Sequence, residues 1–162
     1  MIMKQKPISW DEYFMSVALL STLRSKDPNT QVGACIVSET NHIVGVGYNG
    51  FPKGCDDLVF PWARVGDFLD TKYPYVVHAE QNAILNSSAS VRGARIYVTL
   101  FPCHECAKYI IQAGISEVVF IHNKYNDTDS IKASKKMLDA AKIHYRQIPE
   151  IEIRIERKET VQ

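Results

Sequence analysis

The chain has 162 residues, which is about the length of one domain. Its composition, with 46% hydrophobic and 23% charged residues, is that of a globular protein and excludes disorder as the main state. The formal net charge of +1 leaves no excess of positive charge for binding the phosphates of DNA or RNA. We therefore expect no nucleic-acid partner and favour a small substrate.

The sequence contains neither a recognisable signal peptide nor an apolar run of the roughly 20 residues that span a membrane. We therefore expect a cytoplasmic protein without a membrane partner. In a reducing compartment, the four cysteines are expected to be metal ligands, catalytic groups or buried side chains instead of disulfides. Cys35 lies in an apolar run and is expected in the core, whereas Cys55 is expected to be a loop thiol.

The first half of the chain combines one helix, one hairpin and one long loop. A capping box over residues 9–12 predicts the start of a helix that ends before the turn at Asp27. The β-branched runs 31–38 and 43–48 predict a hairpin. Residues 49–75 show no sustained period, and a loop of this length is expected to bind or cover a ligand.

The second half alternates apolar runs with helical patterns. The predicted strands are 94–100, 117–121 and 143–148, and the predicted helices lie around 78–86, 103–113 and 130–141. This order is typical of right-handed βαβ crossovers. We therefore predict an α/β protein with a three-layer α/β/α arrangement around a mixed sheet of about five strands.

The whole chain, 1–162, is expected to form a single domain with a catalytic core over about 8–148. The remaining segment, 149–162, is interpreted as a mobile tail. Within it, residues 151–157 alternate apolar and charged side chains, so an edge strand and a solvated tail both remain possible interpretations.

Two short motifs, each at the start of a predicted helix, can supply a metal site. Cys103 and Cys106 are three residues apart and share a helix face, near a helix N-terminus that favours thiolate. His78 opens the preceding helix and can reach the same edge of the sheet. One nitrogen and two sulfur ligands leave a tetrahedral Zn²⁺ one ligand short, which is typical of a catalytic zinc. We expect one zinc per chain.

Glu80 distinguishes this interpretation from a structural zinc knuckle. A knuckle needs two further soft ligands close to the cysteine pair, and it assigns no role to a glutamate. Residues i and i+2 diverge on a regular helix, so His78 and Glu80 can serve one site only at an irregular junction before the helix. The catalytic interpretation therefore predicts such a junction.

The sequence His78-Ala79-Glu80, followed by Pro102-Cys103 and Cys106, resembles the zinc-dependent cytidine deaminase superfamily. The resemblance implies a cytidine deaminase-like fold and hydrolytic deamination, with Glu80 moving a proton from water to ring N3 while ammonia leaves C4. Two alternatives remain open: a nucleic-acid base deaminase of the tRNA adenosine type on the same scaffold, and a non-catalytic zinc-stabilised interaction module.

Further runs, 24–35, 45–54 and 70–75, are similar to the deoxycytidylate (dCMP) deaminase family, and the similarity covers roughly residues 8–148. This resemblance implies conversion of dCMP to dUMP, which would feed dTMP synthesis. It also implies substrate contacts at Asn49, on the deoxyribose, and at Ala79, with phosphate contacts at Arg24, Lys26 and Tyr125.

The family resemblance extends to regulation and assembly. It implies activation by dCTP with Mg²⁺, inhibition by dTTP, and a homohexamer. The glycine-rich segment 45–54 lets backbone amides approach an anion, so Gly47, Gly50 and Lys53 are the expected effector contacts.

Overall fold

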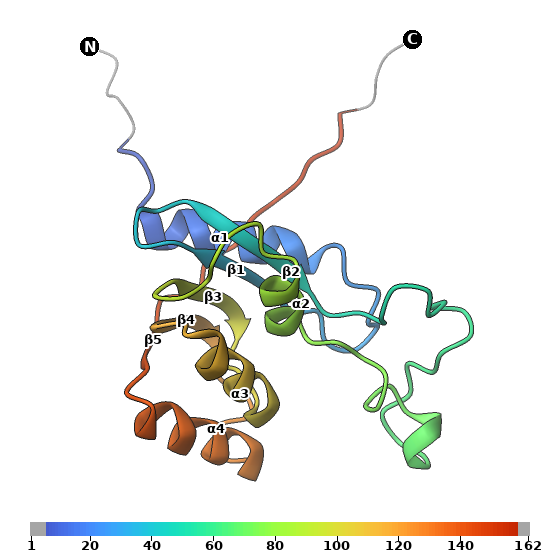
Figure 1. The fold of residues 1–162 in the computed structure, drawn as a ribbon. Coiled ribbons are helices and arrows are strands. Elements are labelled where there is room, and N and C mark those ends of the chain that lie inside the picture. The colour runs from blue at the N-terminus through green and yellow to red at the C-terminus, as the bar shows by residue number, and fades with distance from the viewer. Residues whose placement is uncertain (1–5, 159–162) are drawn as a thin grey trace.

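The computed structural model describes residues 6–158, and in this range the chain forms four α-helices, five β-strands and one short 3₁₀ helix (Figure 1). The elements in chain order are α1 (Trp10–Thr22), β1 (Gly33–Val37), β2 (Ile43–Tyr48), η1 (Phe68–Asp70), α2 (Ala79–Leu85), β3 (Arg95–Leu100), α3 (His104–Ala113), β4 (Glu117–His122), α4 (Asp129–Ala140) and β5 (His144–Gln147). None of the helices within residues 6–158 is long and apolar enough to cross a membrane.

The five strands form one mixed sheet in the order β2-β1-β3-β4-β5. Strand β1 runs antiparallel to both β2 and β3, whereas β3, β4 and β5 are parallel to one another. Helix α1 covers one face of the sheet, and α2, α3 and α4 cover the other (Figure 1). The α/β class and the mixed sheet predicted from the sequence are therefore confirmed.

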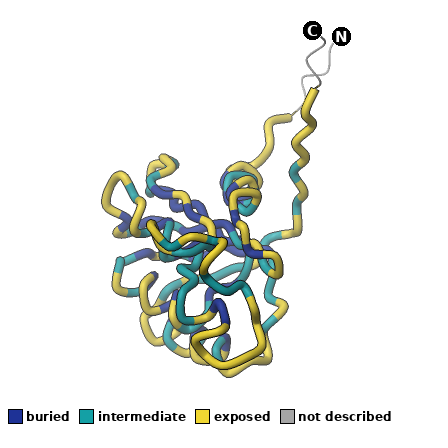
Figure 2. Tube along the Cα trace, turned by 90° about the vertical axis from the view of Figure 1, so that its right-hand side faces the viewer, coloured by how far each residue is buried: buried dark blue, intermediate teal, exposed yellow. Residues whose placement is uncertain are grey.

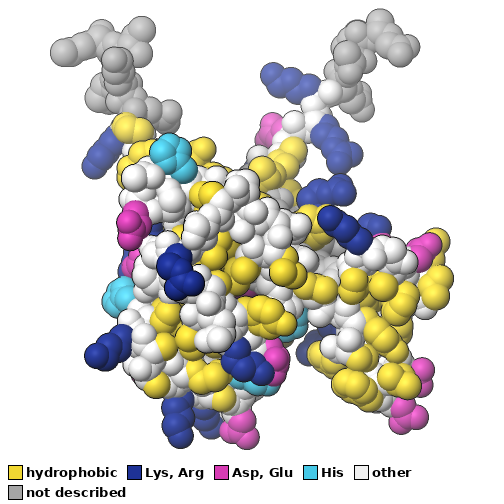
Figure 3. All heavy atoms as spheres, viewed as in Figure 1, with side chains coloured by type: hydrophobic (Ala, Val, Ile, Leu, Met, Phe, Trp, Pro, Cys, Tyr) yellow, Lys and Arg dark blue, Asp and Glu magenta, His cyan; other side chains and the backbone are white. Residues whose placement is uncertain are grey.

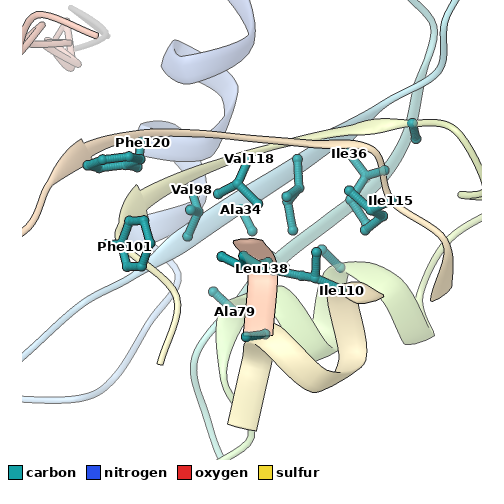
Figure 4. Packing of buried hydrophobic residues seen from close by; sticks show 14 of the residues in the cluster. Ala34, Ile36, Ala79, Val98, Phe101, Ile110, Ile115, Val118, Phe120 and Leu138 are labelled. Atoms are coloured by element: carbon teal, nitrogen blue, oxygen red, sulfur yellow. The ribbon is translucent and has the colours of Figure 1, made fainter. Parts of the chain in front are cut away.

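Successive side chains of the central strands point to opposite faces of the sheet, so the protein has two hydrophobic cores, one on each face. On β1, Ala34 and Ile36 pack with residues of α2, α3 and α4, while Cys35 and Val37 pack with α1. Figure 4 shows the first core, in which apolar side chains of the sheet meet those of the three helices. Buried backbone runs as a band through the middle of the molecule (Figure 2). The expectation that Cys35 is a core residue is confirmed.

Residues 49–75 form the long loop that the sequence predicts. The loop also contains a short helix and an aromatic cluster, which the sequence does not predict. Apart from η1, the loop contains only an isolated bridge between Gly50 and Val77. Its aromatic side chains make a small cluster of their own, with the rings of Phe51 and Trp62 4.1 Å apart and Phe60 against both Phe51 and Tyr75. The loop projects from the body beside α2 (Figure 1).

Gly47 has a packing role that the sequence analysis did not anticipate. A Cβ at this position would lie 2.3 Å from the carbonyl oxygen of Ala79 and 2.4 Å from the amide nitrogen of Ala83. Only a glycine therefore lets β2 approach α2 this closely. This packing explains the glycine without an effector, and the expectation that Gly47 contacts an effector stays a prediction.

The Gly47→Ala substitution is expected to lower the free energy of unfolding by about 1–3 kcal/mol, because the added methyl group forces β2 and α2 apart. Gly50→Ala is the matched control: no atom lies within 4 Å of its added Cβ, so we expect a change within about 0.5 kcal/mol. Chemical denaturation of both variants measures the difference. Equal destabilisation would contradict the packing role of Gly47.

Candidate functional site

Three metal-ligating side chains converge at the N-termini of α2 and α3. The Nδ1 atom of His78 lies 3.4 Å from Sγ of Cys103 and 3.3 Å from Sγ of Cys106. His78 and Cys103 are the residues before the first turns of α2 and α3, both with extended backbone, and Cys106 lies in the first turn of α3. The two motifs predicted to share a metal therefore meet in the structure.

This donor set fits zinc. A tetrahedral Zn²⁺ with bonds of about 2.0–2.3 Å places its ligand atoms roughly 3.5 Å apart, which matches the spacing of the three side chains. Their ligand atoms all lie within 4.8 Å of one another, and within the described residues this is the group of three or more His, Cys, Asp or Glu side chains that could hold a metal. The set therefore offers three protein ligands to a four-coordinate ion.

The surroundings of the three ligands favour the metal-binding form of Cys103 only, because the pKa values of Cys106 and His78 are both raised, that of Cys106 first by its hydrogen bond with Cys103 and then by burial. Metal binding would therefore release protons from these two side chains. Hydrogen bonding, first with Cys106 and then with His78, lowers the pKa of Cys103 to about 4, so its thiolate is favoured. By contrast, burial raises the pKa of Cys35 in the core to about 12, as expected for an inert thiol. The hydrogen bond with Cys103 also raises the pKa of His78, to about 9.

Glu80 lies in the first turn of α2, two residues after His78, and its side chain is buried, with 4% exposed. The irregular junction required by the catalytic interpretation is present, because His78 has an extended backbone and precedes the helix that contains Glu80. Burial raises the pKa of the Glu80 carboxyl, since removing the group from water disfavours its charged form. A buried carboxyl beside a set of metal ligands is suited to proton transfer.

A cavity of about 350 Å³ opens over these residues. His78, Ala79, Glu80 and Cys103 are among the residues that line it. Its apolar lining includes Val32, Val76, Leu100, Phe101 and Ile131. Its polar lining includes Asp27, Asn49, Arg64, Lys72, Tyr73 and Tyr125.

Asp27 organises one wall of this cavity. Its side chain is 1% exposed and accepts backbone hydrogen bonds from Asn29 and Thr30. Its other carboxylate oxygen bonds the ammonium of Lys72 and the side-chain amide of Asn49. Four donors to one buried carboxylate offset the free-energy cost of removing its charge from water. Asp27 therefore fixes Lys72 and Asn49 against the cavity.

Asn49 lines the cavity, and its side chain is already hydrogen-bonded within the protein. Besides Asp27, its amide group donates to the carbonyl of Thr30, and its amide oxygen accepts from Ser25 Oγ and the Val32 amide. Asn49 therefore joins the segment before β1 to the end of β2.

The predicted substrate residues divide into two groups. Ala79, Asn49 and Tyr125 line the cavity, whereas Arg24 and Lys26 do not. The ammonium of Lys26 lies on the surface, 2.5 Å from the carboxylate of Asp57. The chain leaves α1 at Thr22, and both side chains are exposed to solvent, so phosphate contacts at Arg24 and Lys26 stay a prediction that the geometry of the cavity does not support.

The expected effector residues lie outside the cavity. Gly50 exchanges two backbone hydrogen bonds with Val77, the residue before His78. These bonds help to fix the position of His78. Lys53 is exposed in the long loop.

Sequence reasoning missed three cavity residues of the long loop: Arg64, Lys72 and Tyr73. Lys72 and Tyr73 fall in the run 70–75 that resembles the deoxycytidylate deaminase family, whereas the only signal for Arg64 was the length of the loop. Asp27 was recognised as part of a turn but not as the partner of Lys72, because the two are 45 residues apart and no local pattern joins them.

The comparisons with known proteins agree with this geometry. The family model for the cytidine and deoxycytidylate deaminase zinc-binding region matches residues 8–122. The human (Homo sapiens) deoxycytidylate deaminase is 58% identical over 141 residues, which cover 86% of this chain and 79% of the human protein. A probable deoxycytidylate deaminase of Drosophila melanogaster is 55% identical over 155 residues, covering 91% of this chain and 76% of the fly protein.

Solved structures show the same fold. A dCMP deaminase from the cyanophage S-TIM5, in complex with dCMP and dUMP, superposes with a TM-score of 0.67 at 30% identity, covering 90% of this chain and all of that chain (100%). The RibD protein of Acinetobacter baumannii gives a TM-score of 0.61 at 26% identity, covering 85% of this chain and 35% of that chain. The family model matches most of the chain, and the three ligands that the family needs for zinc converge in the structure. The chain therefore belongs to the cytidine and deoxycytidylate deaminase zinc-binding family.

Proposed function

We propose that this protein hydrolyses dCMP to dUMP and ammonia. One observation carries the proposal: a buried glutamate lies beside three metal ligands and lines a cavity of nucleotide size. The 58% identity to human deoxycytidylate deaminase supports dCMP as the substrate. So does the dCMP and dUMP complex of the cyanophage enzyme.

Each residue of the site has a role in this reaction. His78, Cys103 and Cys106 would hold the zinc, which when bound supplies the positive charge that acidifies a water molecule. Glu80 accepts a proton from that water and delivers it to ring N3 as the oxygen bonds to C4. A second proton then passes from the oxygen on C4 to the amino nitrogen, so that the bond between C4 and this nitrogen breaks, the C4 carbonyl forms and ammonia leaves. The apolar wall excludes bulk water from the ring.

Arg64 is the side chain best placed to recognise the phosphate of dCMP. Two cations line the cavity, Arg64 and Lys72, and the charge of Lys72 is neutralised by buried Asp27. Arg64 makes no ion pair with any other residue of the described range, 6–158. A guanidinium binds phosphate oxygens in pairs, and the hydroxyl of Tyr125 on the same cavity adds a further donor.

Regulation, assembly and location extend the proposal. Activation by dCTP with Mg²⁺, inhibition by dTTP, a homohexamer, a role in supplying dTMP synthesis and a cytoplasmic location are all implied by the family resemblance. The identity to deoxycytidylate deaminases supports them. Gly47, Gly50 and Lys53 remain the proposed effector contacts.

The His78→Ala variant is expected to lose both bound zinc and activity, whereas Glu80→Gln keeps one zinc per chain and loses at least about 100-fold in kcat, because it removes only the proton carrier. Metal content by elemental analysis and ammonia release with dCMP measure the two effects. Cys55→Ser, which changes a thiol outside the site, is the matched control and should keep both properties. Full activity of Glu80→Gln would refute the assigned role.

Arg64→Gln is expected to raise the KM for dCMP by about tenfold or more, because a charge-assisted hydrogen bond to the phosphate is lost. Turnover of deoxycytidine, which has no phosphate, should change little. Lys26→Gln serves as the control for removal of a surface cation and should leave the KM for dCMP unchanged. If Lys26→Gln raised the KM and Arg64→Gln did not, the phosphate would bind elsewhere.

A further inference from the structure

Lys72 and its neighbour Thr71 are the two buried residues of the long loop. Between residues 51 and 73 every other residue is half-buried or exposed, whereas Thr71 is 4% and Lys72 is 8% exposed. A lysine is almost never buried to this degree unless its charge is paired. The burial of Lys72 is therefore to be explained by a partner and not by the hydrophobic effect.

The partner of Lys72 is the buried carboxylate of Asp27, which the ammonium bonds from 45 residues further along the chain. The two side chains are 10% and 1% exposed. In every other ion pair within residues 6–158, at least one side chain is 33% exposed or more. A buried pair holds its members more firmly than a surface pair, because loss of one charge leaves the other without compensation.

The backbone of Lys72 is bonded to both sides of the loop. Its amide donates to the carbonyl of Ala63, the residue before Arg64, at 2.9 Å. Its carbonyl accepts from the amides of Tyr75 and Val76, at 3.0 and 2.9 Å. Lys72 therefore connects the segment that carries Arg64 with the segment that leads to the metal ligands.

Arg64 depends on these connections for its position. It lies in an exposed stretch, 63–70, and its backbone makes no hydrogen bond to another residue of the described range. A hydrogen bond with Tyr73, the residue after Lys72, raises the pKa of Arg64. The residue before Arg64 and the side-chain partner of Arg64 are thus both attached to Lys72.

The other contacts of the loop do not reach the cavity. The aromatic cluster holds the outer part of the loop, and none of its members, Phe51, Phe60, Trp62 and Tyr75, lines the cavity. The carbonyl of Trp62 also accepts a hydrogen bond of 3.4 Å from Asn29, at an exposed position. The buried ion pair is therefore the contact that fixes the part of the loop that faces the cavity.

We propose that Lys72, fixed by Asp27, is a positioning residue that holds Arg64 where its guanidinium meets the phosphate of the substrate. The inference rests on the proposed function and deepens it, because it names the residue that prepares the phosphate contact. Since Asp27 neutralises the ammonium, Lys72 acts through Arg64 and not as a phosphate ligand itself. A contact that is ordered in advance lowers the entropic cost of binding, so the effect falls on KM for dCMP.

Substitution of Lys72, measured with two substrates, tests the proposal. Lys72→Met keeps the length of the side chain and removes its charge, while Asp27 keeps its other three donors. We expect KM for dCMP to rise about fivefold or more with a smaller change in kcat, and the preference for dCMP over deoxycytidine, as a ratio of kcat/KM values, to fall by a similar factor. Zinc content and deoxycytidine turnover show that the variant is folded. An equal loss with both substrates would reveal a merely structural role and overturn the proposal.

A double-mutant cycle with Arg64→Gln separates positioning from direct contact. If Lys72 acts through Arg64, adding Lys72→Met to Arg64→Gln should change KM for dCMP by no more than about twofold. Effects that multiply would mean that the ammonium contacts the phosphate itself, which overturns the proposal. Lys72→Gln, which keeps a neutral donor at this position, takes the place of Lys72→Met in the cycle if the methionine variant does not fold.

Tyr75→Phe is the matched control for a general loosening of the loop. It removes the hydrogen bond of 3.0 Å from the Tyr75 hydroxyl to the carbonyl of Leu69 and keeps the ring that packs against Phe60. KM for dCMP should stay within about twofold of the wild-type value. A rise as large as that of Lys72→Met would contradict a specific role of Lys72. Absence of dCMP turnover by the unsubstituted protein would refute the proposed function and this inference together, whereas the other contrary outcomes refute the inference alone.

Discussion

The arrangement of the site depends on one constraint: an imidazole and two thiols, carried by separate helices, must reach within bonding distance of one ion. The fold meets this constraint at one edge of the sheet. Strand β3 delivers Cys103 to the start of α3, and the bridge between Gly50 and Val77 holds His78 at the start of α2. The close approach of β2 and α2, which Gly47 permits, then sets the position of the helix that contains Glu80.

The same edge collects the rest of the cavity. Because β1 runs antiparallel to β2 and β3, the segment before β1 meets the ends of both neighbours. Asp27 lies in that segment, Asn49 follows β2, and Tyr125 follows β4. Buried Asp27 ties this edge together through Asn49 and adds Lys72 from the long loop. The cavity is therefore a property of the mixed topology, and the long loop adds Arg64, Lys72 and Tyr73 to its lining. Figure 3 shows this loop as a lobe that protrudes from the body.

The sequence predicted the parts of this site that local chemistry encodes. The spacing of Cys103 and Cys106 predicted a metal site. The two-residue spacing of His78 and Glu80 predicted an irregular start of the helix. Alternation and capping likewise predicted the sheet and the helix limits closely. The side chains that long-range contacts place were not predictable: Arg64 and Lys72 lie in a loop without a period, and only the folded chain brings Lys72 to Asp27. Arg24 and Lys26 were expected at the site because of their charge at a helix end, which says nothing about the direction in which the chain leaves, and both side chains are exposed outside the cavity lining.

The central claim is that the bound zinc has three protein ligands and one open position. X-ray absorption spectroscopy of the zinc-loaded protein tests it most directly. The account predicts two sulfur atoms at about 2.3 Å together with two light atoms at about 2.0–2.1 Å, one of which exchanges when a substrate analogue is added. A spectrum with three or four sulfur ligands, or one that is indifferent to the analogue, would contradict the catalytic assignment of this centre.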